Sequence, residues 1–218
     1  MVYVINLFTN LKMEEKKISE EESISLIAQI ISRTKERYIG DGNIMLMWGW
    51  LTIAVTGLVW LMLAQTLNPA CNWLWFLIPA VGGVATPIMA RKSRLTRGVK
   101  TYSDRISSQL WTAVGIIALA ASALCIGFEI AGFYTWQTMF VFALIVVPLA
   151  EIIQGIVVRE KALVAGGSVG MAIGLVTTCC IVGGIALYAY WFLPMFMLAF
   201  LCMMVIPGYV INRKGRRK

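Results

Sequence analysis

Apolar residues in this chain come in long continuous blocks, without the periodic polar positions of a water-soluble domain. Between Ile44 and Gln65 there is no Asp, Glu, Lys or Arg. A run of about 20 apolar residues matches the ~30 Å hydrocarbon layer of a bilayer at about 1.5 Å rise per residue. A chain inside lipid must pair every backbone N–H and C=O internally, and these runs lack the alternation of barrel strands. They therefore predict transmembrane helices.

Six such runs predict an all-α fold, a polytopic transmembrane helical bundle. The last apolar stretch, 162–211, is too long for one crossing, which needs roughly 17–25 residues. We divide it near Tyr188–Trp191, so that Pro194 falls in the first turn of the next helix, where a missing N–H costs least. The predicted spans are about 44–65, 73–90, 110–130, 137–158, 164–187 and 192–211, between an N-terminal segment 1–43 and a basic tail 212–218.

The basic residues test this arrangement independently, because Lys and Arg accumulate in cytoplasmic loops. All 19 of them fall in the N-terminal segment, in the loops after the second and fourth predicted spans, or in the tail. The three opposite loops hold none. This segregation predicts a multi-pass membrane protein with both termini in the cytoplasm. A chain of five spans would place the basic tail outside.

The composition supports a membrane protein and argues against a nucleic-acid partner. Hydrophobic residues make up 59% of the chain and charged residues 14%, whereas soluble domains are about 25% charged. The formal net charge is +8. Because the positive charges flank the spans, attraction to anionic lipid headgroups explains them. We therefore expect no direct binding of nucleic acid.

A cytoplasmic amphipathic helix is predicted at about residues 20–38. Ser19 and Glu22 have the spacing of a capping box, and Ile24, Ile27 and Ile31 form one apolar stripe. The stripe could lie on the membrane surface, dock on a partner helix, or pack against the protein's own cytoplasmic loops. Upstream of this helix, we expect Met13, which opens a polar segment, to be the natural start.

Glu151, in the fourth predicted span, is the residue that is most costly to place in lipid. Pro148, Gln154 and Gly155 share its helix face. An ionisable side chain at the centre of a span costs about 2.5–3.5 kcal/mol on insertion scales, and such residues commonly mark ion or proton pathways. The alternative is that Glu151 bonds Gln154 or a neighbouring helix, or is reached by water or Arg159. Glu151 and Gln154 form the candidate intramembrane polar site.

Gly166, Gly170 and Gly174 in the fifth predicted span recur every four residues. Such a ridge of small residues lets helices approach closely, within one chain first and in a homodimer second. The segment 166–170 also matches G-x-S-x-G, but a nucleophile elbow needs a strand–turn–helix and a base, and the chain has no histidine. We therefore expect no enzymatic activity.

No cofactor-binding or metal-binding pattern is found in the sequence. The five cysteines lack the spacing of a metal site. Cys71 and Cys125 both fall toward the outer side of the predicted spans, which leaves a disulfide between them as an alternative to buried thiols. Glu129, at the outer end of the third predicted span, is expected to be solvated.

The run SEEESISLIAQIISRTKERY, the GDGN that follows it and the Trp-Gly-Trp of the first span resemble an uncharacterised family of small six-helix inner-membrane proteins of Bacteroidetes. The segments VKTYSDRISSQLW and IPGYVINRK extend the likeness over most of the chain. The resemblance implies no known activity, and hence no catalytic residue. It also implies a cytoplasmic regulator protein as partner, because such proteins are often encoded beside a small helix-turn-helix regulator.

Two hypotheses about function follow. The first is a non-enzymatic membrane protein that acts through a partner protein at the cytoplasmic face, using the helix at 20–38 and the loop at 91–105. The second is a small proton- or cation-coupled transporter or channel built around Glu151 and Gln154.

Overall fold

The computed structural model of the chain describes residues 24–25, 42–66, 68–97, 102–133 and 135–216. The chain divides into two units, Met1–Arg37 and Tyr38–Lys218. In the first unit, the described residues Ile24 and Ser25 are helical, and the Ile24 side chain is exposed. The rest of the predicted helix at 20–38, with Ile27 and Ile31, and the expected start at Met13 lie outside the described residues.

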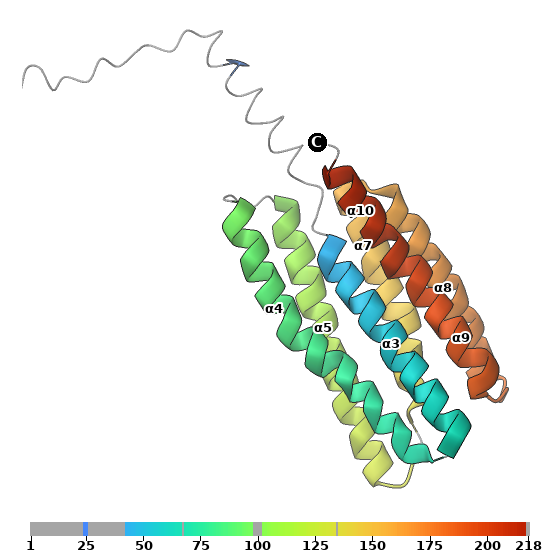
Figure 1. The fold of residues 1–218 in the computed structure, drawn as a ribbon. Helices are drawn as coiled ribbons and strands as arrows, with labels where there is room; N and C mark the ends of the chain where they lie inside the picture. Colours follow the sequence, from blue (N-terminus) through green and yellow to red (C-terminus); the bar gives the residue numbers. More distant parts are fainter. Residues whose placement is uncertain (1–23, 26–41, 67, 98–101, 134, 217–218) are drawn as a thin grey trace, which may run out of the picture. The chain divides into compact units, whose positions relative to one another are not determined.

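The second unit is a bundle of helices, and in its described part six helices are long and apolar enough to cross a membrane (Figure 1). The predicted all-α, six-helix fold class is therefore confirmed. The membrane-crossing segments are Gly42–Thr66, Ala70–Lys92, Ser103–Ile130, Gln137–Val158, Lys161–Val182 and Ala189–Lys214.

Several of these segments consist of more than one helical element. The first, third and fifth spans are the single helices α3 (Gly42–Thr66), α5 (Tyr102–Ile130) and α8 (Lys161–Val182). The second span joins the 3-10 helix η1 (Pro69–Phe76) to α4 (Leu77–Arg97). The fourth span is made of α6 (Gln137–Val141), the π-helical η2 (Phe142–Val146) and α7 (Val147–Val158), and the sixth of α9 (Ala189–Phe200), the π-helical η3 (Leu201–Val205) and α10 (Ile206–Arg216).

Both π-helical segments end two residues before a proline. Pro148 follows η2 and Pro207 follows η3. Proline has no N–H, so the carbonyls four residues earlier, those of Leu144 and Met203, cannot accept the usual helical hydrogen bond. A wider turn accommodates the missing bond in each span. Such π segments are rare and often lie at functional sites.

The turn between the fifth and sixth spans differs from the prediction. The fifth helix ends at Val182, five residues before the predicted end, because Gly183 and Gly184 follow and Gly184 adopts a left-handed φ of 70°. The sixth span then begins at Ala189. As a result Pro194 lies inside α9 and not in its first turn, so the prediction for this proline is wrong.

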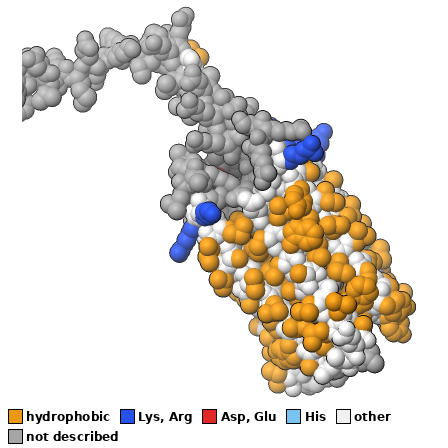
Figure 2. All heavy atoms as spheres, in the orientation of Figure 1, with side chains coloured by type: hydrophobic (Ala, Val, Ile, Leu, Met, Phe, Trp, Pro, Cys, Tyr) orange, Lys and Arg blue, Asp and Glu red, His pale blue; other side chains and the backbone are white. Residues whose placement is uncertain are grey.

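The start of α3, the end of the described part of α10 and the turn between α7 and α8 meet at one end of the bundle. Asn212 Nδ2 donates a 2.6 Å hydrogen bond to Asn43 Oδ1. Lys214 Nζ donates to both carboxylate oxygens of Glu160, at 2.6 and 2.8 Å. We call this the basic end, since the Lys and Arg side chains visible in Figure 2 lie there, while hydrophobic side chains cover the flank.

The core lies between α3, α8 and the fourth and sixth spans. In the most apolar window of the sixth span 44% of residues are buried, against 6% in the second span and 11% in α5. The second span and α5 therefore flank the bundle. On α4, Gly82 leaves room for the Trp48 ring of α3, whose Nε1 donates a 2.9 Å hydrogen bond to Thr86 Oγ1.

Candidate intramembrane carboxyl site

The side chain of Glu151 points into the bundle. Its relative exposure is 0%, and Pro148, Ala150 and Gly155 of α7 are buried with it. Leu149 is exposed, on the side of the helix that faces lipid. Glu151 therefore belongs to the interior of the protein, and bilayer lipid does not surround it.

On one side, α7 packs directly against α8. A Cβ atom at Gly167 would come within 2.9 Å of the Pro148 carbonyl oxygen, and one at Gly155 within 2.8 Å of Leu163 Cβ. These contacts leave no space for a side chain between the two backbones. They also fix the antiparallel register, which puts Glu151 close to the level of Gly167.

The sixth span packs against the same part of α8 as closely as α7 does. A Cβ at Gly166 would lie 2.7 Å from the Cys202 carbonyl oxygen, and one at Gly170 would lie 2.7 Å from Met203 Sδ. The Pro148 ring also lies 3.2 Å from that second position. Gly170 is thus the point where the fourth, fifth and sixth spans meet, about one helical turn from Glu151.

The predicted glycine ridge faces the interior of its own bundle. Gly166, Gly170 and Gly174 are all buried, and a Cβ at Gly174 would collide with the carbonyl group of Leu144 in η2. The surface that a homodimer would need at this ridge is occupied by the fourth and sixth spans. Ser168, in the G-x-S-x-G segment, lies within α8, where its Oγ donates to the Val164 carbonyl at 2.7 Å.

The two members of the predicted polar site do not bond to each other. Gln154 Oε1 accepts a 2.7 Å hydrogen bond from Trp111 Nε1 of α5. Within the described part of the chain, neither carboxylate oxygen of Glu151 has a hydrogen-bond partner. Arg159 is exposed in the turn after α7 and does not pair with Glu151. Because an unpaired buried charge costs far more than a neutral polar group, a proton on Glu151 removes the larger part of this cost.

Two further polar groups on α5 share this condition: Ser107, which the sequence pattern did not single out, and Glu129, which is predicted from the sequence to be solvated. Among the described residues, Ser107 Oγ and Glu129 Oε2 are also buried without a hydrogen-bond partner. The prediction of a fully solvated Glu129 is therefore wrong for one of its oxygens. The spacing of residues 107, 111, 122, 125 and 129 could have indicated the burial of Glu129, because it places these residues on one face of α5.

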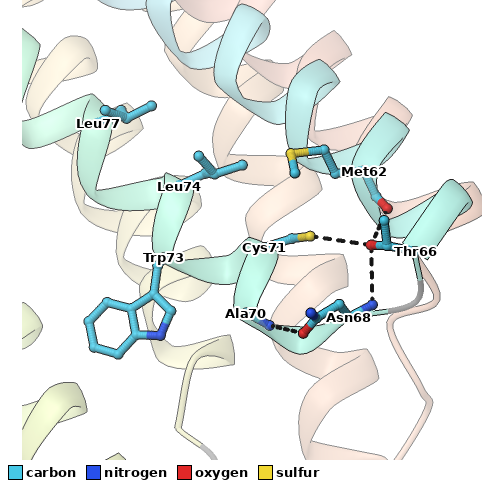
Figure 3. Close-up of a pocket in the computed structure, with 8 residues that line it drawn as sticks. All are labelled: Met62, Thr66, Asn68, Ala70, Cys71, Trp73, Leu74 and Leu77. Atoms are coloured by element: carbon cyan, nitrogen blue, oxygen red, sulfur yellow. Dashed lines mark hydrogen bonds between the residues drawn. The ribbon is translucent and has the colours of Figure 1, made fainter.

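A hollow of about 380 Å³ lies at the opposite end of the bundle from the basic end, between α3 and the second span (Figure 3). Thr66 Oγ1 donates to the Met62 carbonyl and lies 3.6 Å from Cys71 Sγ, while Asn68 Oδ1 accepts from Ala70 N. The hydroxyl, thiol and amide oxygen of these residues are engaged in these contacts, and the rest of the lining is mostly apolar. Its lining residues are Met62, Thr66, Asn68, Ala70, Cys71, Trp73, Leu74 and Leu77.

The cysteines form no disulfide in the structure. Cys71 and Cys125 are free thiols in buried positions, and Cys125 Sγ lies 3.6 Å from the Thr135 carbonyl oxygen. The alternative of a bridge between them is therefore wrong. Within the described residues, no group of three or more His, Cys, Asp or Glu is placed to hold a metal ion.

Comparison with known proteins finds no match to this chain among family models, curated proteins or solved structures. The resemblance to small Bacteroidetes membrane proteins stays a prediction from the sequence.

Proposed function

We propose that this protein is a small proton-coupled membrane transporter in which Glu151 takes up and releases the proton. The observation that carries the proposal is a carboxyl group with 0% exposure and no hydrogen-bond partner among the described residues. A carboxyl that only stabilised the bundle would be expected to have partners, since an unsatisfied buried polar group weakens a fold. Gln154, its nearest polar neighbour along the helix, is bonded to Trp111 instead.

The helices around Glu151 support a site that changes its packing. The fourth and sixth spans each contain a proline-linked π segment, and both lie against glycines of α8. The glycines at these contacts contribute no side chain of their own, which lowers the obstruction to a shift of one helix against another. Protonation or deprotonation of Glu151 changes the relative free energy of two such helix packings. This free-energy difference couples the proton to a conformational change.

We further propose that the basic end faces the cytoplasm and that the protein resides in the inner membrane. The Lys and Arg side chains described in the bundle cluster at that end, beside the Lys214–Glu160 ion pair. Lys and Arg are retained on the cytoplasmic side during insertion, and there they meet anionic lipid headgroups. We infer that the protein is not an enzyme.

Proton flux into liposomes tests the role of Glu151. The purified full-length chain is reconstituted in phosphatidylethanolamine and phosphatidylglycerol vesicles with an internal pH-sensitive dye, and a potassium gradient with valinomycin drives proton entry. We expect flux from the wild type and none above empty vesicles from Glu151→Gln, which keeps the shape but cannot release a proton. Glu160→Gln, in the turn after α7, is the matched control and should conduct like the wild type. Equal flux from Glu151→Gln and the wild type would overturn the proposal.

Chemical modification provides a second measurement that does not depend on proton flux. Dicyclohexylcarbodiimide, a hydrophobic reagent, adds to protonated carboxyl groups inside membranes and rearranges to a stable N-acylurea. Mass spectrometry of the labelled wild type should show the adduct on the peptide containing Glu151. The adduct should be absent from Glu151→Gln and unchanged in Glu160→Gln. If Glu151 stays unmodified while exposed carboxyls react, it does not hold a proton.

Action through a partner protein is the second candidate, and one observation favours it. Ile24 of the predicted apolar stripe, in the unit Met1–Arg37, is helical with 67% of its side chain exposed. An exposed apolar residue on a helix suits docking to a groove. Deletion of residues 14–38 should abolish capture of a cytoplasmic regulator protein by the tagged chain, whereas Glu151→Gln should not. If the deletion changes no captured protein and no phenotype, this candidate is excluded.

A further inference from the structure

One face of α5 carries a row of residues at intervals of three and four, which we call the α5 seam. Such spacing places side chains above one another on a helix. Each member is buried or half-buried. The seam consists of Ser107, Trp111, Val114, Ala118, Ser122, Cys125 and Glu129.

The α5 seam contacts the fourth span at two levels and the turn before α6 at a third. Near the basic end, Trp111 donates to Gln154 of α7. In the outer half, Ser122 Oγ lies 3.7 Å from Met139 Sδ of α6. At the outer end, Thr135 Oγ1 donates a 3.2 Å hydrogen bond to the Cys125 carbonyl. The register of Trp111 with Gln154 puts Val114, three residues after Trp111, at the level of Glu151, three residues before Gln154, because α5 and α7 run in opposite directions.

Unpaired buried oxygens concentrate at this contact between helices. Of the described residues, Ser107, Glu129 and Glu151 have buried side-chain oxygens without a hydrogen-bond partner. Two of these residues belong to the α5 seam, and the third is one turn from Gln154, which the seam binds. A packed interface with a purely structural role would satisfy such groups. Hydroxyl and carboxyl groups that accept and donate hydrogen bonds are what a proton relay through a membrane requires.

We infer that the part of the α5 seam from Val114 to Glu129 is the outward proton route of Glu151 and that Glu129 is the carboxyl at which protons exchange with the outer solution. This inference rests on the proposed function. A proton that leaves Glu151 converts the Glu129 carboxylate to the acid, and its release outside restores that carboxylate. Glu151 is left as a carboxylate until a proton from the cytoplasmic side reloads it, so one proton crosses in each cycle.

The middle of the α5 seam is closed in this structure, which is what a transporter requires of one state. Between Glu151 and Ser122 the seam presents Val114, which is 9% exposed, and Ala118. Opening this stretch needs a movement of α5 against the fourth span. Only 11% of the apolar window of α5 is buried, so α5 has few contacts to break.

The other charged residues described on the helices around the route lie at the basic end, which leaves Glu129 as the carboxyl group at the outer end. Among the described residues of α5, the other charged side chains are Asp104 and Arg105, which lie in the first turn near the basic end. On α8 the charged residue is Lys161, and on the sixth span Arg213 and Lys214, again at the basic end. The thiol groups on α5, α8 and the sixth span are those of Cys125, Cys179, Cys180 and Cys202.

Two serines provide a matched pair for the test. Ser122 and Ser168 each donate to the carbonyl four residues earlier in their own helix, but Ser122 lies in the α5 seam and Ser168 is exposed on α8. In the liposome assay above, Ser122→Val and Glu129→Gln should lower proton flux at least roughly tenfold, since positioned groups commonly speed proton transfer by more than that. Ser168→Val should conduct like the wild type.

The outcomes separate this inference from the proposed function. Both seam variants should keep carbodiimide modification of Glu151 and the wild-type unfolding temperature, because the inner site and the fold are intact. Ser122→Ala, which removes only the hydroxyl, replaces Ser122→Val if the latter does not elute as a folded protein. Wild-type flux from Glu129→Gln and the Ser122 variant, with none from Glu151→Gln, would exclude the seam and keep Glu151 as the proton carrier. Wild-type flux from Glu151→Gln would exclude both.

Discussion

Individual glycines in this bundle have opposite roles, according to what a side chain would meet. At Gly174 a Cβ atom would overlap the Leu144 carbonyl, whereas at Gly115 and Gly127 of α5 it would meet nothing within 4 Å. The sequence shows three glycines at four-residue spacing, and this pattern correctly marks a helix that another element approaches. It cannot show which backbone approaches, because that depends on the rotation of each helix about its axis.

Substitution of these glycines should separate the two roles. Gly174→Ala is expected to lower the free energy of unfolding by about 1–3 kcal/mol, because it forces α8 away from η2. Gly115→Ala should have no destabilising effect, since alanine favours the helix by up to about 1 kcal/mol in water. Thermal unfolding of the purified proteins in detergent measures both. Equal unfolding temperatures for the two variants would contradict the packing described for α8.

For the candidate site too, the sequence identifies the residue but not its contacts. Glu151 stands out in the sequence because an acid in an apolar run is costly wherever the run folds. Its separation from Gln154 was not predictable, because the hydrogen bond that occupies Gln154 comes from Trp111, 43 positions earlier in the chain.

At the scale of elements, proline sets the form of the fourth and sixth spans. Pro148 and Pro207 each follow a π-helical segment, and each of these segments packs against a glycine of α8. The hydropathy of a span does not reveal such a segment, since a wider turn changes no residue type. It does change which side chains face the neighbouring helix, because every residue before it is rotated relative to those after it.

Contacts at the basic end predict a cross-link between the first and last elements. In a variant with all five natural cysteines replaced, Asn43→Cys with Asn212→Cys should form a disulfide on mild oxidation, because the two native side chains are 2.6 Å apart. The shift in mobility on a non-reducing gel measures it.

The control is Asn43→Cys with Asn68→Cys. These positions flank α3, whose 25 residues span about 38 Å at 1.5 Å per residue. A cross-link in the control as readily as in the first pair would mean that oxidation joins separate molecules, and the placement of α10 beside α3 would lose its support.

For the whole molecule, the charge distribution predicts which end faces the cytoplasm. Single cysteines at Ala131 and at Arg213, both exposed and at opposite ends of the bundle, can be tested with a membrane-impermeant maleimide in spheroplasts, in the background without natural cysteines. We expect labelling of Ala131→Cys in intact spheroplasts and of Arg213→Cys only after lysis. The reverse pattern would overturn the proposed orientation, and labelling of both before lysis would exclude the six-span topology.

The sequence by itself determined the fold class, the number of spans and the segregation of the basic residues. These are local properties, since the free energy of placing a segment in lipid is summed residue by residue along the chain. The tertiary structure decided the partners: Trp111 on Gln154, Leu144 on Gly174, and no partner for Glu151 within the described residues. Hydrophobicity does not select among such partners in lipid, because all lipid-facing surfaces are alike, and only close packing and hydrogen bonds distinguish one arrangement of helices from another.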